Sequence, residues 1–150
     1  MTLLPFVVSA DRSQNAPWQV LAGGDRTGGS VTFGEARVPP RGSGPARHVH
    51  SREDEAIFII EGVLTVEVGP DRYEAGPGTL TWLPRGVPHA FGNLGDEPVW
   101  AFGVITPSGL EGMFSEIGAY LARLHGPPDE QVIADINARY GVTPVGPPIS

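Results

Sequence analysis

The sequence predicts a mainly β domain that ends in two short helices. From Phe6 to about Thr106, short runs rich in Val, Ile, Phe and Trp alternate with Gly, Pro, Asn and Asp, which is the pattern of strands joined by tight turns. After Pro107 the apolar residues change to the spacing of amphipathic helices. At 150 residues the chain is long enough for one domain with a core of its own.

The expected strands follow one another along the first two thirds of the chain. Two segments have the composition of hairpin turns and indicate two successive hairpins: Glu61-Gly62 and Gly69-Pro70-Asp71. Strands are expected at 6–9, 18–21, 30–38, 47–50, 55–60, 63–68, 79–83, 89–91 and 99–105. Several short strands with a turn after about every ten residues indicate a barrel or a sandwich.

The tail from residue 107 to 150 is expected to contain two helices that pack on this β domain. Ser108-Gly109-Leu110-Glu111 has the form of a capping box at the start of the first helix. A second helix fits 129–140, and the proline-containing segment 142–150 is expected to follow the surface. The apolar face of the first helix consists of Leu110, Met113, Phe114, Ile117, Leu121 and Leu124.

Composition excludes several kinds of chemistry. All ten basic residues are Arg, so the chain has no Lys for a Schiff base, and without Cys it has no thiolate ligand or nucleophile. A net charge of −7 with scattered arginines argues against nucleic-acid binding. Because the N-terminus lacks the basic start of a signal peptide and no long apolar run follows, we expect a cytoplasmic protein without a membrane partner.

Three histidines and one glutamate form a candidate metal site. His48 and His50 are two residues apart on an expected strand, so their side chains point to the same face. Glu55 starts the next strand after a polar turn, and His89 follows a loop rich in Pro and Gly that can direct it inward. Three imidazoles and one carboxylate suit a first-row divalent metal ion.

These residues lie in two segments that resemble the two sequence motifs of the cupin superfamily. Residues 42–62 read Gly42-x5-His48-x-His50-x4-Glu55-x6-Gly62, and residues 78–93 read Gly78-x5-Pro84-x-Gly86-x2-His89-x3-Asn93. The resemblance implies a conical jelly-roll β-barrel over residues 1–106. It also implies one divalent metal ion per chain (Fe, Ni, Mn, Co or Zn), held by His48, His50, Glu55 and His89. Among the other motif residues, Gly62 and Gly86 are expected to permit turns, and Asn93 to hold a turn by bonding backbone groups.

Within the superfamily the chain resembles the single-domain quercetin-dioxygenase-like cupins. Residues 106–114, Thr-Pro-Ser-Gly-Leu-Glu-Gly-Met-Phe, are similar to a segment that often follows their barrel. The resemblance implies a mononuclear non-haem metal-dependent dioxygenase that acts on a small phenolic or enolic compound. Two alternatives stay open. One is a non-redox metal enzyme, such as an isomerase, polyketide cyclase or decarboxylase, and the other is a non-catalytic cupin that binds a small molecule.

The expected substrate pocket lies beside the metal ligands, on the inner face of the strands. The two-residue alternation of a strand, counted from Glu55 and from His89, predicts an apolar lining. Glu55 is also the candidate catalytic base, because a carboxylate that loosens from a metal can accept a substrate proton. The predicted lining residues are Ile57, Ile59, Phe91 and Trp82, with Leu83 as the alternative to Trp82.

The same alternation points Phe58 and Ile60 outward, where large apolar side chains need a cover. The resemblance adds that cupins of this size commonly form dimers, often with an exchanged N-terminal strand. We therefore expect a homodimer, with residues 6–8 as the candidate for that strand.

Overall fold

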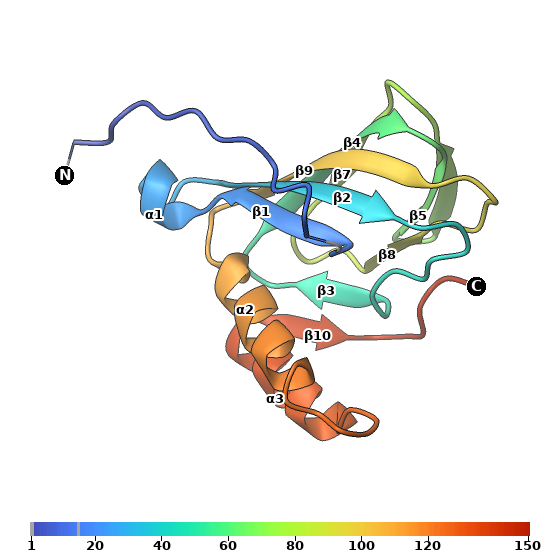
Figure 1. Ribbon diagram of the computed structural model, residues 1–150. Helices are drawn as coiled ribbons and strands as arrows, with labels where there is room; N and C mark the ends of the chain where they lie inside the picture. The colour runs from blue at the N-terminus through green and yellow to red at the C-terminus, as the bar shows by residue number, and fades with distance from the viewer. Residues whose placement is uncertain (1, 15) are drawn as a thin grey trace.

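The mainly β fold with helices at the C-terminal end is confirmed by the computed structural model, which describes residues 2–14 and 16–150 (Figure 1). Two antiparallel five-stranded sheets face each other. The first has the order β1-β2-β9-β4-β7, with β1 (Trp18–Ala22), β2 (Thr32–Val38), β4 (Asp54–Glu61), β7 (Leu80–Leu83) and β9 (Val99–Thr106). The second has the order β10-β3-β8-β5-β6, with β3 (His48–His50), β5 (Leu64–Val68), β6 (Asp71–Ala75), β8 (His89–Gly92) and β10 (Val142–Pro144). The helices are α1 (Gly24–Thr27), α2 (Leu110–Leu121) and α3 (Glu130–Arg139).

Alternate residues of the strands form the core between the two sheets. In β9, Val99, Ala101, Gly103 and Ile105 are buried, whereas the residues that alternate with them are only partly covered. This alternation is the expected signature of a strand with one face on the core. The central core cluster consists of Val38, Ile57, Ile59, Leu64, Val66, Ala75, Leu83, Val99 and Ala101.

A second apolar cluster attaches the helices to the barrel. Met113 of α2 and Ile136 of α3 pack with Ile105 of β9 and Val142 of β10, and Trp18 of β1 lies against the ring of Phe114 at 5.9 Å between centroids. Figure 1 shows α2 and α3 together beside β10, on one side of the barrel. In residues 2–14 and 16–150, every helix is too short or too polar to span a bilayer.

Residues 142–144 form a strand, which corrects the expectation for the first part of the segment 142–150, whereas residues 145–150 lie in no helix or strand. β10 pairs with β3, with Val142 opposite His50 and Pro144 opposite His48. The backbone N–H of Val145 also donates to the carbonyl of Arg47 at 2.7 Å. A proline is tolerated here because β10 is the edge strand of its sheet.

Three further features differ from those expected from the sequence: the segment 6–9, the strand β6 and the start of α2. Residues 6–9 form no strand. The strand β6, which completes the hairpin after Gly69, was not expected from the sequence. The capping box is also corrected, because α2 begins after Gly109 without a side-chain cap. The Glu111 carboxylate accepts hydrogen bonds from the N–H of Gly109 at the start of α2, and also from the N–H of Gly24 and the hydroxyl of Thr32, and so ties α2 to the β1–β2 region.

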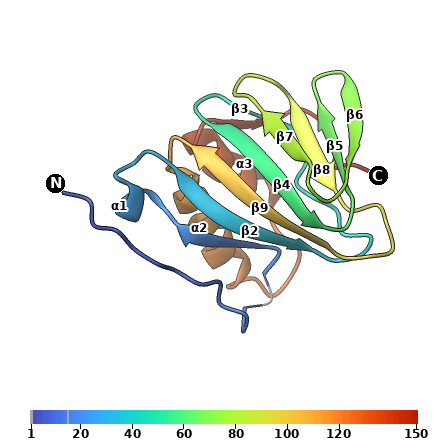
Figure 2. The same cartoon turned by 90° about the horizontal axis from the view of Figure 1, so that it is seen from above.

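The outer face of the first sheet is apolar and exposed around β4 and β7. Phe58 of β4 lies between Phe102 of β9 and Leu80 of β7 in the strand register, and Figure 2 shows these strands side by side. The exposed fractions are 41% for Phe58, 64% for Leu80 and 53% for Trp82. The outward orientation predicted for Phe58 and Ile60 is therefore confirmed.

We propose that a second copy of the chain covers this face. A twofold interface uses the same patch on both subunits, so an exposed apolar patch on one copy would meet its equivalent on the other. The N-terminal segment carries further exposed apolar side chains, with Leu4 77% and Val7 97% exposed, and it extends away from the barrel (Figures 1 and 2).

Sedimentation equilibrium at micromolar concentration is expected to give a dimer for the wild type and a monomer for Phe58→Arg. Leu121→Arg places the same charge at an exposed leucine of α2, and should leave the dimer intact. A monomeric wild type would show that this face is not a subunit contact.

Candidate metal centre

The candidate ligands come from three strands that meet at one point inside the barrel. His48 and His50 are alternate residues of β3, so both rings point to the interior. β8 pairs with β3 at a single position, with His89 directly opposite His48. Glu55 lies near the start of β4, in the facing sheet. The histidines are at most 8% exposed, and the Glu55 side chain is 13% exposed.

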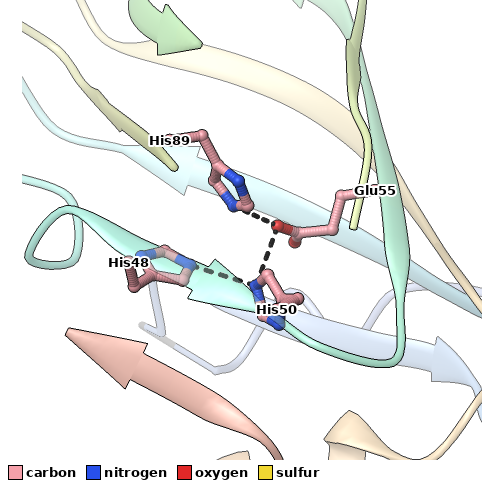
Figure 3. A group of neighbouring side chains, drawn as sticks. All are labelled: His48, His50, Glu55 and His89. Atoms are coloured by element: carbon pink, nitrogen blue, oxygen red, sulfur yellow. Dashed lines mark hydrogen bonds and ion pairs between the residues drawn. The ribbon is translucent and has the colours of Figure 1, made fainter. Parts of the chain in front are cut away.

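The donor atoms of these four residues converge (Figure 3). Nε2 of His48 lies 3.0 Å from Nε2 of His50. Oε2 of Glu55 lies 2.9 Å from Nε2 of His89 and 3.2 Å from Nε2 of His50. The structure thus brings together every ligand that the sequence predicted, with one donor atom from each within 4.8 Å of the others.

This geometry fits a single divalent ion. With metal–nitrogen bonds of about 2.0–2.1 Å, neighbouring donors of an octahedral ion are about 3 Å apart, and the three short separations given above are 2.9–3.2 Å. Three imidazole nitrogens and one carboxylate oxygen are donors that suit Fe, Co, Ni, Mn and Zn. The residues present therefore fit the group that the sequence motifs imply.

Hydrogen bonds on the far side of two rings direct their Nε2 atoms to the centre. Nδ1 of His48 lies 2.6 Å from the carbonyl oxygen of Ala46, and Nδ1 of His89 lies 3.2 Å from that of Val87. In each case Nδ1 is the donor, which leaves Nε2 free as an acceptor for a metal ion.

The charge states of the ligands also suit a cation. Burial is the main cause that lowers the pKa of His48 to about 4, so its ring is neutral at neutral pH. Burial alone would raise the pKa of Glu55, but its contacts with the rings of His50 and His89 hold it well below its ordinary value. A neutral imidazole and an ionised carboxylate are the forms that bind metals.

The comparison with protein families agrees with this geometry. Residues 34–105, which extend from within β2 to the end of β9 but for its last residue and include all four candidate ligands, match the family model of the cupin domain. The chain has the cupin fold. No curated protein sequence matches the chain.

Solved structures show the cupin fold, also called the double-stranded β-helix, in related proteins. A sugar phosphate isomerase of the cupin superfamily from Silicibacter pomeroyi DSS-3 is 27% identical with a TM-score of 0.52, over 60% of this chain and 59% of that one. A predicted oxalate decarboxylase from Thermotoga maritima is 20% identical with a TM-score of 0.57, over 60% and 78% of the two chains. A cupin family protein from Methanocaldococcus jannaschii is 18% identical with a TM-score of 0.55, over 71% and 94%. This chain thus spans about three fifths of the length of the isomerase.

The loop before His89 is attached to the ligand-bearing strands of the cupin domain. Arg85 donates to the Asp54 carboxylate from its backbone N–H at 2.8 Å and from its guanidinium at 3.1 and 2.8 Å. The N–H of Gly86 donates to the carbonyl of His50 at 2.8 Å. Gly62 and Gly86 have φ values of 80° and 77°, as expected for their turns. The contact of Arg85 with Asp54 had no signal in the sequence, because it joins a loop to the first residue of β4, 31 residues away.

Asn93 holds a turn of the cupin domain away from the metal ligands, as its sequence context predicted. Its side-chain amide donates to the carbonyls of Pro39 and Glu97 at 3.0 and 2.7 Å, and its oxygen accepts from the N–H of Gly95 at 3.0 Å. The residue is completely buried. It therefore satisfies backbone groups that water cannot reach.

Asn93→Ala is expected to lower the free energy of unfolding by at least about 2 kcal/mol, because buried backbone groups lose their partners. Bound metal should stay at the wild-type level. Urea denaturation and metal analysis of the same samples measure the two effects. A variant that loses metal but keeps full stability would place Asn93 in the metal site instead.

Three of the predicted pocket residues lie inside the barrel and one does not. Ile57 and Ile59 are buried in the central core, and Phe91 packs against it. The prediction that Trp82 lines the pocket is wrong, because Trp82 pairs with outward-facing Ala56 and is 53% exposed. Leu83, opposite Glu55 in the register, is the buried residue of that pair.

Proposed function

We propose that the protein is a mononuclear metal enzyme that acts on a small organic substrate. One divalent ion would be held by Nε2 of His48, His50 and His89 and by the Glu55 carboxylate. The observation that carries this proposal is the convergence of these four donors, with two of the rings oriented by backbone carbonyls behind them. Four protein ligands leave two of six octahedral positions for a substrate or water.

Dioxygenation of a phenolic or enolic compound is the first candidate reaction. When bound, a redox-active ion at this site would supply Lewis acidity and a path for electrons between an electron-rich substrate and dioxygen. The apolar side chains of Ile57, Ile59 and Phe91 near the ligands favour a flat, largely apolar substrate. The similarity of residues 106–114 to quercetin-dioxygenase-like cupins supports the same candidate.

Glu55 is the residue that could move a proton. Its Oε2 faces His50 and His89, and within residues 2–14 and 16–150 no hydrogen bond reaches its Oε1. A carboxylate that binds through one oxygen can accept a substrate hydroxyl proton on the other. The partial exposure of the side chain, at 13%, is consistent with access for a substrate.

Non-redox isomerisation is the second candidate reaction. It is favoured by the 27% identity with the sugar phosphate isomerase from Silicibacter pomeroyi, which is higher than the identity with the oxalate decarboxylase given above. The same proton acceptor would serve an isomerisation through an enediol: Glu55 would take a proton from the hydroxyl-bearing carbon next to a carbonyl group and return it to the former carbonyl carbon, while the hydroxyl proton moves to the former carbonyl oxygen.

Metal analysis followed by two turnover screens tests these candidates. Protein purified without a His-tag and without added metal is expected to contain close to one transition-metal ion per chain, measured by plasma mass spectrometry. Oxygen uptake with flavonols and diketones would support the dioxygenase, and oxygen-independent turnover of sugar phosphates would support the isomerase. Protein that neither carries nor takes up a divalent metal would contradict the metal-enzyme proposal. Metal-loaded protein without turnover in either screen would favour a binding role.

A further inference from the structure

Glu53 is a buried acid without a partner. It lies in the turn between β3 and β4 and is only 5% exposed. Its Oε2 is buried and has no hydrogen-bond partner in the described part of the chain. The neighbouring acid, Asp54, is paired with Arg85, whereas Glu53 has no arginine partner there. Because buried carboxylates are destabilising unless they are paired, the position of Glu53 needs an explanation.

The atom that faces Glu53 is also unpartnered. Nδ1 of His50 is buried without a hydrogen bond and lies 3.7 Å from Oε2 of Glu53. The other two histidine ligands have a backbone carbonyl behind Nδ1, at 2.6 and 3.2 Å. His50 is therefore the one ligand whose outer nitrogen faces a carboxylate instead of a carbonyl.

The hydrogen on the His50 ring accounts for both unpartnered atoms. A neutral imidazole has one N–H group. Because His48 donates from Nδ1, its Nε2 is an acceptor, and Nε2 of His50 lies between this acceptor and the Glu55 carboxylate at 3.0 and 3.2 Å. Without a metal, the His50 hydrogen is best placed on Nε2. Nδ1 is then an acceptor that faces another acceptor.

We propose that Glu53 is a positioning residue for the metal ligand His50. When a divalent ion takes Nε2, the single hydrogen of the ring must lie on Nδ1, and the Glu53 carboxylate is the acceptor in front of it. The pair would orient the ring and increase its basicity toward the metal. This inference rests on the proposed function, because it gives Glu53 a partner only in the metal-bound state.

A structural role for Glu53 would give the opposite result in metal-free protein. If Glu53 stabilised the fold itself, its removal would lower stability without metal. A positioning residue has no partner in the metal-free protein and gains one only when metal is bound. Its removal should therefore leave the metal-free protein at least as stable and weaken only metal binding.

Glu53→Gln, which preserves shape and removes the charge, tests the proposal in the full chain. Zinc affinity, measured by competition with a chromophoric chelator, is expected to fall about 10- to 100-fold, the usual effect of losing such an outer partner. The urea midpoint of metal-free protein should not fall. Glu61→Gln removes the same charge at the exposed end of β4, and its zinc affinity should equal that of the wild type.

The His50 N–H gives a second readout. Zinc loading of the wild type is expected to produce a downfield Nδ1–H proton signal that is protected from exchange, and Glu53→Gln should weaken or lose it. Wild-type zinc affinity in Glu53→Gln would overturn the role of Glu53 and leave the metal site standing. A fall in metal-free stability without loss of affinity would assign Glu53 to the fold. A wild type that binds no zinc would overturn the metal site as well.

Discussion

Replacing His89 with alanine is expected to remove nearly all bound metal from the protein. His89 is completely buried and lies directly opposite His48, so no water molecule from bulk solvent can easily take its place as a ligand. Loss of an outer partner of a metal ligand costs 10- to 100-fold in affinity, so loss of the ligand itself should exceed about 100-fold. His50→Ala should have the same effect, since Nε2 of His50 contacts two of the other three donor atoms.

The measurement is metal content by plasma mass spectrometry, together with zinc affinity by chelator competition. His125→Ala is the matched control, because His125 is exposed in the tail and should keep full metal. A buried histidine can also support the fold, so His89→Gln, which retains most of the volume, is measured beside His89→Ala. Full metal content in folded His50 and His89 variants would show that these residues are not ligands.

The convergence of the ligands could be predicted from the sequence because it depends on local rules. The alternation of a strand places His48 and His50 on one face, and a turn before Glu55 allows the next strand to return. The same rule predicts that Phe58 and Ile60 point outward. The rule alone could not decide between Trp82 and Leu83, because the answer depends on the register between β7 and β4. Only the structure gives this register, in which Leu83 lies opposite Glu55.

Long-range pairing accounts for most of what the sequence did not show. β10 has three residues, one of them proline, and its strand character comes from its partner β3. Residues 6–9 have the apolar pattern of a strand but form none, since a strand needs a neighbour as well as a pattern. Glu53 was interpreted as part of a polar turn, and neither its burial nor its approach to His50 follows from its position in the sequence.

The C-terminal pairing also bears on the metal site. Val142 and Pro144 lie opposite the two histidine ligands of β3, and α3 and β10 belong to the cluster that holds the helices on the barrel. β3 would otherwise be an edge strand with three residues and a single paired position with β8. The tail therefore completes the sheet that carries the ligands, as well as covering the barrel.

Glu55→Gln is expected to reduce kcat by at least about 100-fold, which is within the range that a positioned proton acceptor contributes. The rate is measured with the compound that the wild type turns over. Glutamine keeps the shape of the side chain and one oxygen that can bind a metal, so part of the metal should remain. It has no carboxylate to accept a proton. Rates are therefore compared per bound ion, with the metal content measured on the same sample.

Glu55→Asp separates the two roles of this residue. Aspartate keeps the charge and the ability to accept a proton, but its side chain is shorter by one methylene group. The carboxylate therefore moves away from Nε2 of His50 and His89, which lie 3.2 and 2.9 Å from Oε2 of Glu55 in the wild type. It should therefore lose metal affinity and keep more activity per bound ion than Glu55→Gln. Equal rates per bound ion for the wild type and Glu55→Gln would restrict Glu55 to metal binding. The proton acceptor would then have to be a group on the substrate or a bound water molecule.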